Sequence, residues 1–371
     1  MLTPQVEIQL IAVVTAVSCA LPGVFLVLRR VALMSDAITH AVLLGIVLAF
    51  FVVQDIASPA LMVAAAATGV LTVALVELLS HTRLVREDAA IGLVFPVLFS
   101  LAVILISRYA GDTHLDTDAV LLGELAFAPF DRFAAFGYDL GPQALWVMGG
   151  VLLLGALFIG LLYKELKLAT FDAGLAAALG LSPALVHYGL MTLVSVTAVG
   201  AFDAVGSVLV VALMIAPPAA AYLLTDRLAH MIGLSALIGA ASALGGYWLA
   251  SALDASIAGA MATVAGVAFG LAWLLAPERG LLAAALRRSR QRAEFADLML
   301  AVHLLNHEAT AAEAQESRVA HLGEHLRWAE PYVVQVVRRA ERRGLVVQRG
   351  GLLALTERGR QLAGRTLGAE G

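Results

Sequence analysis

The residues best suited to chemistry are a carboxylate and an imidazole, Asp36 and His40, within the apolar run 28–51. Four residues apart on a helix, the two side chains share a face. A charge inside a membrane segment costs at least about 2.5 kcal/mol and by default marks an ion or substrate path. One oxygen and one nitrogen ligand suit Mn(II), Zn(II) or Fe(II). The pair therefore predicts the wall of a metal-ion pathway; the alternative is a helix cap at Asp36 and a hydrogen-bonded core histidine at His40.

Composition indicates the kind of protein that positions this pair. The chain of 371 residues is 61% hydrophobic and only 14% charged, which is too apolar for a soluble globular protein. Its formal net charge of −4 divides into −8 over 1–280 and +4 over 281–371. The single cysteine, Cys19, excludes an internal disulfide and a thiolate metal cage. We therefore expect a transmembrane domain over 1–280, a basic linker over 281–293 and a small soluble domain over 294–371.

The first domain is predicted to be an all-α polytopic membrane protein with about nine transmembrane helices. Its apolar segments approach the ~20 helical residues that cross a bilayer core of ~30 Å. They are 6–28, 34–53, 58–80, 89–108, 145–164, 184–202, 204–223, 230–252 and 257–276. The sixth and seventh are short, and the expected breaks there are Gly200, Gly206 and the pair Pro217–Pro218.

Charge predicts how these segments are oriented. Basic residues fall on alternate loops, which places the N-terminus outside and the C-terminus in the cytosol. The opposite loops are acidic, and carboxylates around an entrance concentrate cations; acidic loops that only satisfy topology are the alternative. The candidates for an outer acidic vestibule are Asp112, His114, Asp116, Asp118, Asp203 and Asp254.

The inner loop 169–183 predicts a short helix, because an Ala- and Leu-rich run begins after a turn-prone Phe-Asp pair and ends at Gly180 and Pro183. Such a helix is either a docking element for another protein or an ordinary interfacial helix. The sequence has no GxxxxGK[ST] motif, so the chain does not hydrolyse ATP itself. A separate ATPase or an ion gradient must drive transport.

Four stretches resemble the membrane permease of manganese/zinc/iron ABC importers, in matching order over about residues 5–280. They are RRVALMSDAITHAVLLGIVLAF (29–50), FDAGLAAALGLSP (171–183), VGSVLVVALMIAPPAAAYLL (205–224) and LDASIAGAMATVAGVAFGL (253–271). The resemblance implies a permease dimer in a bacterial-type plasma membrane, seated on two cytosolic ATPase subunits that bind the ATP. It also implies an extracytoplasmic metal-binding protein that delivers Mn(II), Fe(II) or Zn(II), and no permanently bound cofactor.

The same resemblance assigns residues. It implies that Asp36 and His40 match the family's Asp-x-x-x-His pathway pair. The stretch 111–127 resembles the manganese- or iron-associated branch of the family more than the zinc branch. The family resemblance also implies a coupling helix in the ATPase groove, with the residues Phe171, Asp172, Leu175, Leu179 and Leu181. A gradient-driven secondary transporter of divalent metals and a membrane-tethered, metal-responsive DNA-binding regulator are the alternative functions.

The tail from Glu294 has the periodicity of a soluble α+β domain. Helices and then a two-stranded hairpin with a Gly-Gly turn predict a winged helix-turn-helix at 294–308, 311–326, 329–345, 346–356 and 356–367. The stretch RRAERRGLV…LLALTERGRQLA resembles the DNA-binding domain of iron- and manganese-dependent repressors, without the dimerising and metal-binding part that follows it there. Nucleic acid is not expected as a partner. The residues that could contact phosphates, or are simply solvated, are Arg338, Arg339, Arg342 and Arg343.

Histidines in the tail form two i,i+4 pairs near Glu308 and Glu324. Pairs with this spacing can chelate a divalent metal, although histidines on a soluble helix are often only surface residues. The hypothetical cytosolic metal sensor consists of His303, His307, His321 and His325.

Overall fold

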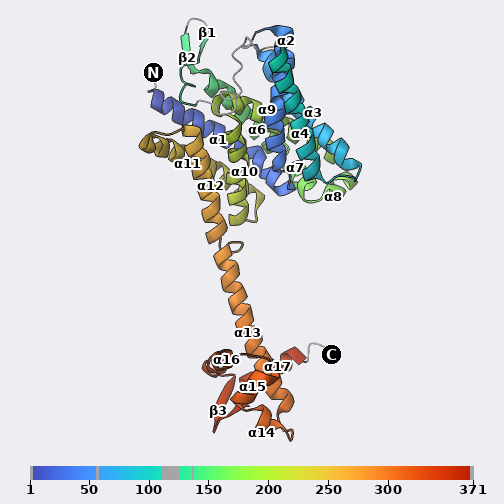
Figure 1. The fold of residues 1–371 in the computed structure, drawn as a ribbon, viewed down its shortest axis with the longest axis vertical. Helices are drawn as coiled ribbons and strands as arrows, with labels where there is room; N and C mark the ends of the chain where they lie inside the picture. The colour runs from blue at the N-terminus through green and yellow to red at the C-terminus, as the bar shows by residue number, and fades with distance from the viewer. Residues whose placement is uncertain (1–2, 56–57, 110–124, 136–137, 368–371) are drawn as a thin grey trace. The chain divides into compact units, whose positions relative to one another are not determined.

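The computed structural model describes residues 3–55, 58–109, 125–135 and 138–367 (Figure 1). The chain divides into two compact units, Met1–Gly280 and Leu281–Gly371. Each unit has a hydrophobic core of its own.

Within the described residues of the first unit, nine helices are long and apolar enough to cross a membrane. They are α1 (Pro4–Arg29), α2 (Leu33–Val53), α3 (Pro59–His81), α4 (Glu87–Tyr109), α6 (Gln143–Leu161), α9 (Pro183–Val205), α10 (Ser207–Leu224), α11 (Leu228–Leu253) and α12 (Ile257–Leu275). Each lies within a few residues of its predicted segment, so the prediction of a helical polytopic membrane protein is confirmed. Serine caps explain several starts: the hydroxyls of Ser58, Ser182 and Ser256 accept hydrogen bonds from the first turns of α3, α9 and α12.

Only one of the three expected breaks interrupts a helix. Gly206 separates α9 from α10 and has a φ of +78°, a conformation that glycine adopts without steric cost. Gly200 lies inside α9, and Pro217 and Pro218 lie inside α10, so the prediction of breaks at these positions is wrong. Helices in a membrane tolerate such residues because neighbouring groups satisfy the freed backbone.

Small residues bring α1 close to its neighbours α10 and α11. A Cβ atom on Gly23 would lie 2.1 Å from the main-chain oxygen of Met214 on α10, so only glycine fits there. In the same way, a Cβ atom on Gly69 of α3 would lie 1.9 Å from the Ser195 hydroxyl of α9. These contacts agree with the close helix packing that small residues allow in lipid.

The segment between α4 and α6 contains a hairpin that the sequence did not predict. Strand β1 (Arg132–Ala135) pairs antiparallel with β2 (Tyr138–Pro142). Arg132 lies 3.3 Å from the buried Glu7 carboxylate of α1 and 2.5 Å from Asp139 of β2, so it joins the hairpin to the bundle. The main-chain N–H of Gly141 and the Arg132 guanidinium hold the pKa of Asp139 below its usual value.

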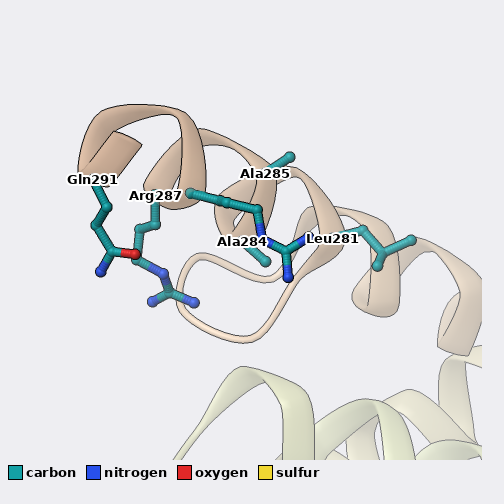
Figure 2. Close-up of a pocket in the computed structure, with 6 residues that line it drawn as sticks. Leu281, Ala284, Ala285, Arg287 and Gln291 are labelled. Carbon is teal, nitrogen blue, oxygen red and sulfur yellow. The ribbon is translucent and has the colours of Figure 1, made fainter. Parts of the chain in front are cut away.

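The second unit begins with a long helix, α13 (Leu281–His307), whose first half is the stretch expected to be a basic linker. Its first turns line a surface pocket with apolar side chains and the long polar side chains of Arg287 and Gln291 (Figure 2). The predicted helix over 311–326 is divided into α14 (Glu313–Glu316) and α15 (Val319–His325).

The rest of this unit is α16 (Glu330–Arg342), the hairpin of β3 (Val346–Arg349) and β4 (Leu352–Leu355), and α17 (Glu357–Leu367). The strands pair antiparallel, and Gly350 and Gly351 turn between them with positive φ angles, as the Gly-Gly turn predicts. The core of the unit is formed by apolar side chains of α13, α15, α16, the hairpin and α17.

Candidate functional site

The pair formed by Asp36 and His40 lies at the start of α2. Nε2 of His40 is 3.4 Å from Oδ1 of Asp36, and the two side chains are 28% and 39% exposed, respectively. Ala32 occupies the N-cap position, so the carboxylate of Asp36 does not cap this helix. The hydroxyl of Thr39 donates to the main-chain oxygen of Asp36 and does not occupy its carboxylate. The carboxylate of Asp36 therefore makes no cap bond, and its Oδ1 faces Nε2 of His40.

Aromatic side chains of α4 hold the imidazole. The ring of His40 stacks on Phe95 with centroids 5.8 Å apart and meets the edge of Phe99 at the same distance. Such ring pairs stabilise one orientation of the imidazole through packing.

The pair offers few ligands. Within the part of the chain that the structure describes, no third histidine, cysteine or carboxylate joins Asp36 and His40 in a cluster fit for a metal ion. Two protein ligands bind a divalent ion weakly, and weak binding is what a conducting path requires so that the ion can leave.

The residues expected to form the outer vestibule are only partly described. Asp203, near the end of α9, and Asp254, which caps the end of α11, are both exposed. Since α10 returns between α9 and α11, the two carboxylates lie at the same end of the bundle. The other four residues lie outside the described residues: Asp112, His114, Asp116 and Asp118.

A polar network that sequence reasoning missed joins α1, α3 and α9. It lies at the end of the bundle opposite to Asp203 and Asp254. Nε2 of His187 lies 2.7 Å from Oε1 of Glu77, and Tyr188 donates a hydrogen bond to Oε2 of Glu77. Nη1 of Arg29 lies 3.1 Å from Nδ1 of His187, and Nε of Arg29 donates to the Thr170 hydroxyl. Glu77 and His187 were detectable as ionisable residues in apolar segments, but their pairing was not, because they are 110 positions apart.

The same network reaches the predicted docking helix. The helix α7 (Tyr163–Phe171) contains Thr170, and Asp172 follows it as the N-cap of α8 (Ala173–Ala178). Oδ1 of Asp172 accepts a 2.8 Å hydrogen bond from the main-chain N–H of Leu175. This cap explains why a short helix begins at this point in the chain.

The surface of α8 and its flanks is apolar and open. Phe171, Leu175 and Leu179 are 62%, 47% and 65% exposed, whereas Ala176 is fully buried and anchors the helix, and Leu181 is half-buried. Three large exposed apolar side chains beside a carboxylate form the kind of patch that another protein covers. The patch connects to the bundle through Thr170 and Arg29.

The four candidate arginines of the second unit have two different kinds of surroundings. Arg339 and Arg343 lie 2.9 Å and 3.0 Å from the buried carboxylate of Asp297, so these two side chains are engaged within the unit. Arg338 and Arg342 are exposed on α16.

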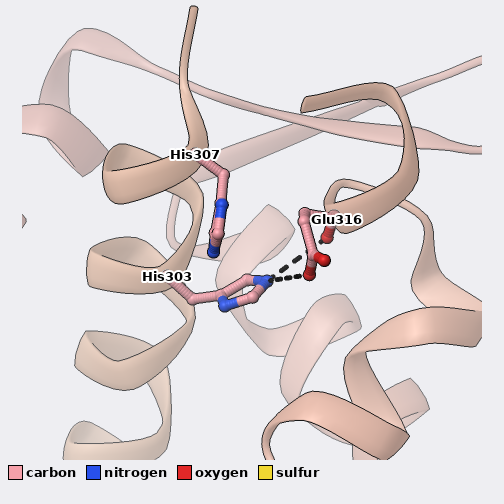
Figure 3. Close-up of side chains that lie close together, drawn as sticks. All are labelled: His303, His307 and Glu316. Atoms are coloured by element: carbon pink, nitrogen blue, oxygen red, sulfur yellow. Dashed lines mark hydrogen bonds and ion pairs between the residues drawn. The ribbon is translucent and has the colours of Figure 1, made fainter. Parts of the chain in front are cut away.

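Three of the four candidate histidines lie near one carboxylate. His303 and His307 of α13 lie close to Glu316 of α14 (Figure 3). Nε2 of His325 of α15 lies 3.2 Å from Oε1 of Glu316. His321 is held by different groups, Gln315 at 2.9 Å and Glu324 at 3.6 Å.

The chain is similar to known proteins over its membrane unit and, in one case, over almost its whole length. The family model described as the ABC 3 transport family matches residues 5–276. The zinc transport system membrane protein TroD of Treponema pallidum is 51% identical over 357 residues, which is 96% of this chain and 97% of TroD. The manganese transport system membrane protein MntD of Bacillus subtilis is 49% identical over 282 residues, which is 76% of this chain and 95% of MntD. The solved structure of PsaBC from Streptococcus pneumoniae in complex with Fab matches with a TM-score of 0.63 and 27% identity, covering 75% of this chain and 94% of that one.

Proposed function

This chain belongs to the ABC 3 transport family, and from that premise we propose that it is the membrane-spanning subunit of an ATP-binding-cassette importer. The importer moves a divalent metal ion into the cytosol and is powered by a separate ATPase subunit. The observation that carries this proposal is an aspartate and a histidine one helical turn apart in a membrane helix, in a chain 51% identical to a zinc transport protein over almost its whole length.

Family membership supports this function over the two alternatives. TroD and MntD are named as membrane proteins of transport systems, which fits neither a lone gradient-driven carrier nor a tethered transcription regulator. The metals named for these relatives, zinc and manganese, are two of the three ions that one carboxylate and one imidazole suit.

The path of the ion is proposed to pass Asp36 and His40. The approach of Nε2 of His40 to within 3.4 Å of Oδ1 of Asp36 supports this, because the two ligand atoms point to one place. Water or a neighbouring group completes the coordination, and a permease homodimer could supply that group. Affinity order alone would favour zinc among the three ions, so selectivity rests with metal availability and the extracytoplasmic binding protein.

Coupling to ATP hydrolysis is proposed to run through α8. The exposed side chains of Phe171, Leu175 and Leu179 and the carboxylate of Asp172 suit a groove on a cytosolic ATPase subunit. A shift of α7 would act on Arg29 through Thr170, and Arg29 lies just before the turn that leads into α2. A contact chain thus connects the docking surface with the helix that carries the ion pair.

The remaining proposals concern orientation and the second unit. The N-terminus lies outside, 1–280 form the permease, 281–293 link it to the tail, and residues 294–371 form a cytosolic winged-helix domain that regulates or scaffolds the importer. The order α15, α16, β3 and β4 supports a helix-turn-helix with a wing. The engagement of Arg339 and Arg343 by Asp297 argues against nucleic acid as its partner.

Vesicles that contain this chain and its partner ATPase test the proposal. Uptake of manganese or zinc that requires ATP is the expected result. Uptake driven by a pH gradient alone, with no effect of ATP, would instead support the secondary transporter.

A further inference from the structure

We propose that the C-terminal unit itself binds a divalent transition-metal ion, through His303, His307, Glu316 and His325. This site is separate from the Asp36–His40 pair. It does not depend on the function proposed for the membrane unit.

The four side chains converge from three helices. Ligand atoms of His303, His307 and Glu316 all lie within 4.8 Å of one another, as Figure 3 shows. His325 extends the group, because its Nε2 lies 3.2 Å from Oε1 of Glu316. Its ring centroid is 5.8 Å from that of His303 and 6.4 Å from that of His307. An ion among these groups would need only small side-chain rotations.

The carboxylate of Glu316 is the strongest indication of a ligand. The residue is 8% exposed, yet its Oε2 atom has no hydrogen-bond partner among the described residues. A buried carboxylate without compensating hydrogen bonds is costly, and coordination of a cation removes that cost. Nε2 of His303 lies 3.6 Å from this Oε2 atom.

The half-buried imidazole of His303 points toward Glu316. Nε2 of His303 also lies 3.3 Å from the main-chain oxygen of Glu316, a contact that a bound metal would replace.

The donor set indicates the class of metal. Three imidazoles and one carboxylate match the nitrogen and oxygen ligands of four-coordinate Zn(II), and they also suit Mn(II) and Co(II). No thiolate is available, since Cys19 lies in α1 of the other unit.

Binding would tie together parts of the unit that few other contacts join. The ion would connect the last turns of α13 with the short helix α14 and the end of α15. The helix α15 packs on α16, so metal binding would stiffen the helix pair that precedes the hairpin. A metal-dependent rise in the stability of the tail follows directly, because a ligand that binds only the folded state stabilises it.

The test uses the full-length protein in detergent, stripped of metal by a chelator, incubated with Zn(II) or Co(II) and separated from free ion. The informative variant is His307→Gln/His325→Gln, because both side chains are partly exposed and their replacement leaves the core intact. His321→Gln is the matched control on the same helix as His325. All proteins also carry Asp36→Asn and His40→Gln, so that the membrane pair does not contribute.

The control should retain one metal ion per chain. The double variant lacks two ligands. Its metal affinity should therefore fall by more than the roughly 10–100-fold that is lost when only a group hydrogen-bonded to a ligand is removed. With Co(II), the visible absorption of histidine-ligated cobalt should appear in the control and be absent from the double variant. Equal metal content and equal spectra in both proteins would overturn the proposal. A control that binds no metal would overturn it as well.

Discussion

Nε2 of His187 lies 2.7 Å from Oε1 of Glu77, so an imidazole of α9 and a carboxylate of α3 are in close polar contact between two membrane helices. The guanidinium of Arg29 can only donate, so Nδ1 of His187 accepts from it and the proton of the neutral imidazole lies on Nε2. A single histidine therefore contacts both α1 and α3. We expect this network to couple the movements of these helices, and substitutions in it leave Asp36 and His40 unchanged.

Loss of the Glu77 carboxylate should uncouple transport from ATP hydrolysis. Glu77→Ala leaves His187 and Tyr188 without their shared acceptor, and we expect ATPase activity in the assembled importer to persist while metal uptake per ATP falls. Tyr188→Phe removes one hydrogen bond, worth about 1 kcal/mol, and should have a smaller effect. Parallel measurement of phosphate release and metal uptake in vesicles checks this order. Equal coupling ratios in wild type and Glu77→Ala would contradict it.

Substitution of either member of the pathway pair should abolish uptake. Asp36→Asn and His40→Gln each remove a ligand while nearly preserving size, so we expect uptake at least tenfold below wild type and unchanged assembly with the ATPase. The matched controls are Asp88→Asn and His81→Gln, an exposed aspartate and an exposed histidine on α4 and α3. Wild-type uptake in the pathway variants, measured in the same vesicles, would remove this site from the transport path.

A charge on the apolar surface of α8 should prevent docking of the ATPase. Leu175→Asp changes a side chain that is 47% exposed, so the isolated permease should fold as before but fail to copurify with its ATPase. Leu84→Asp provides the control, because Leu84 is an exposed leucine in the loop between α3 and α4. Asp172→Ala should weaken docking less, since it loses a helix cap worth about 1 kcal/mol. Copurification of Leu175→Asp at the wild-type ratio would argue for another docking surface.

Removal of the buried aspartate in the tail should destabilise that unit. Asp297 holds Arg339 and Arg343 across α13 and α16, and hydrogen bonds to charged groups contribute about 1.5–3 kcal/mol each. Both arginines can reach water once released, so we expect Asp297→Ala to lower the unfolding free energy of the tail by about 2–3 kcal/mol. Exchange of Arg338, which is exposed, for Gln should change it by less than about 0.5 kcal/mol. Denaturant unfolding of the Asp297→Ala and Arg338→Gln proteins, followed by the fluorescence of Trp328 in the tail, measures both changes.

The contact between Glu308 and Arg360 should make tail stability depend on acid pH. Hydrogen bonds from the Arg360 guanidinium are the main cause of a lowered pKa at Glu308. A carboxylate whose pKa is lower in the folded state adds stability above its unfolded pKa of about 4.3, and that stability is lost as pH falls through the folded value. Arg360→Gln should therefore flatten this part of the unfolding profile, whereas Arg358→Gln on the same helix should not. Identical pH profiles for both variants would show that the contact does not act in solution.

The membrane helices were predictable because each needs a long apolar run, and proline or serine marks several of the starts. The hairpin β1–β2 was not, since strands of four and five residues leave too short a pattern to recognise. Pro217 and Pro218 were misleading, because a helix among other helices can keep its course where an isolated one would break.

The candidate sites show the same difference between local and long-range information. The i,i+4 spacing was enough to place Asp36 beside His40 and His303 beside His307. It could not identify Glu316 as their companion or exclude His321, since those positions depend on how α14 and α15 fold back onto α13. The Glu77–His187 pair was beyond prediction for the same reason.

The absence of a side chain at Gly23 has a mechanical consequence. The main chains of α1 and α10 approach closely there, so a larger side chain would force the two helices apart. We expect the two helices to move together in any rearrangement of the bundle. Gly206, just before the start of α10, has a positive φ angle and is the position at which we expect such a movement to bend the chain.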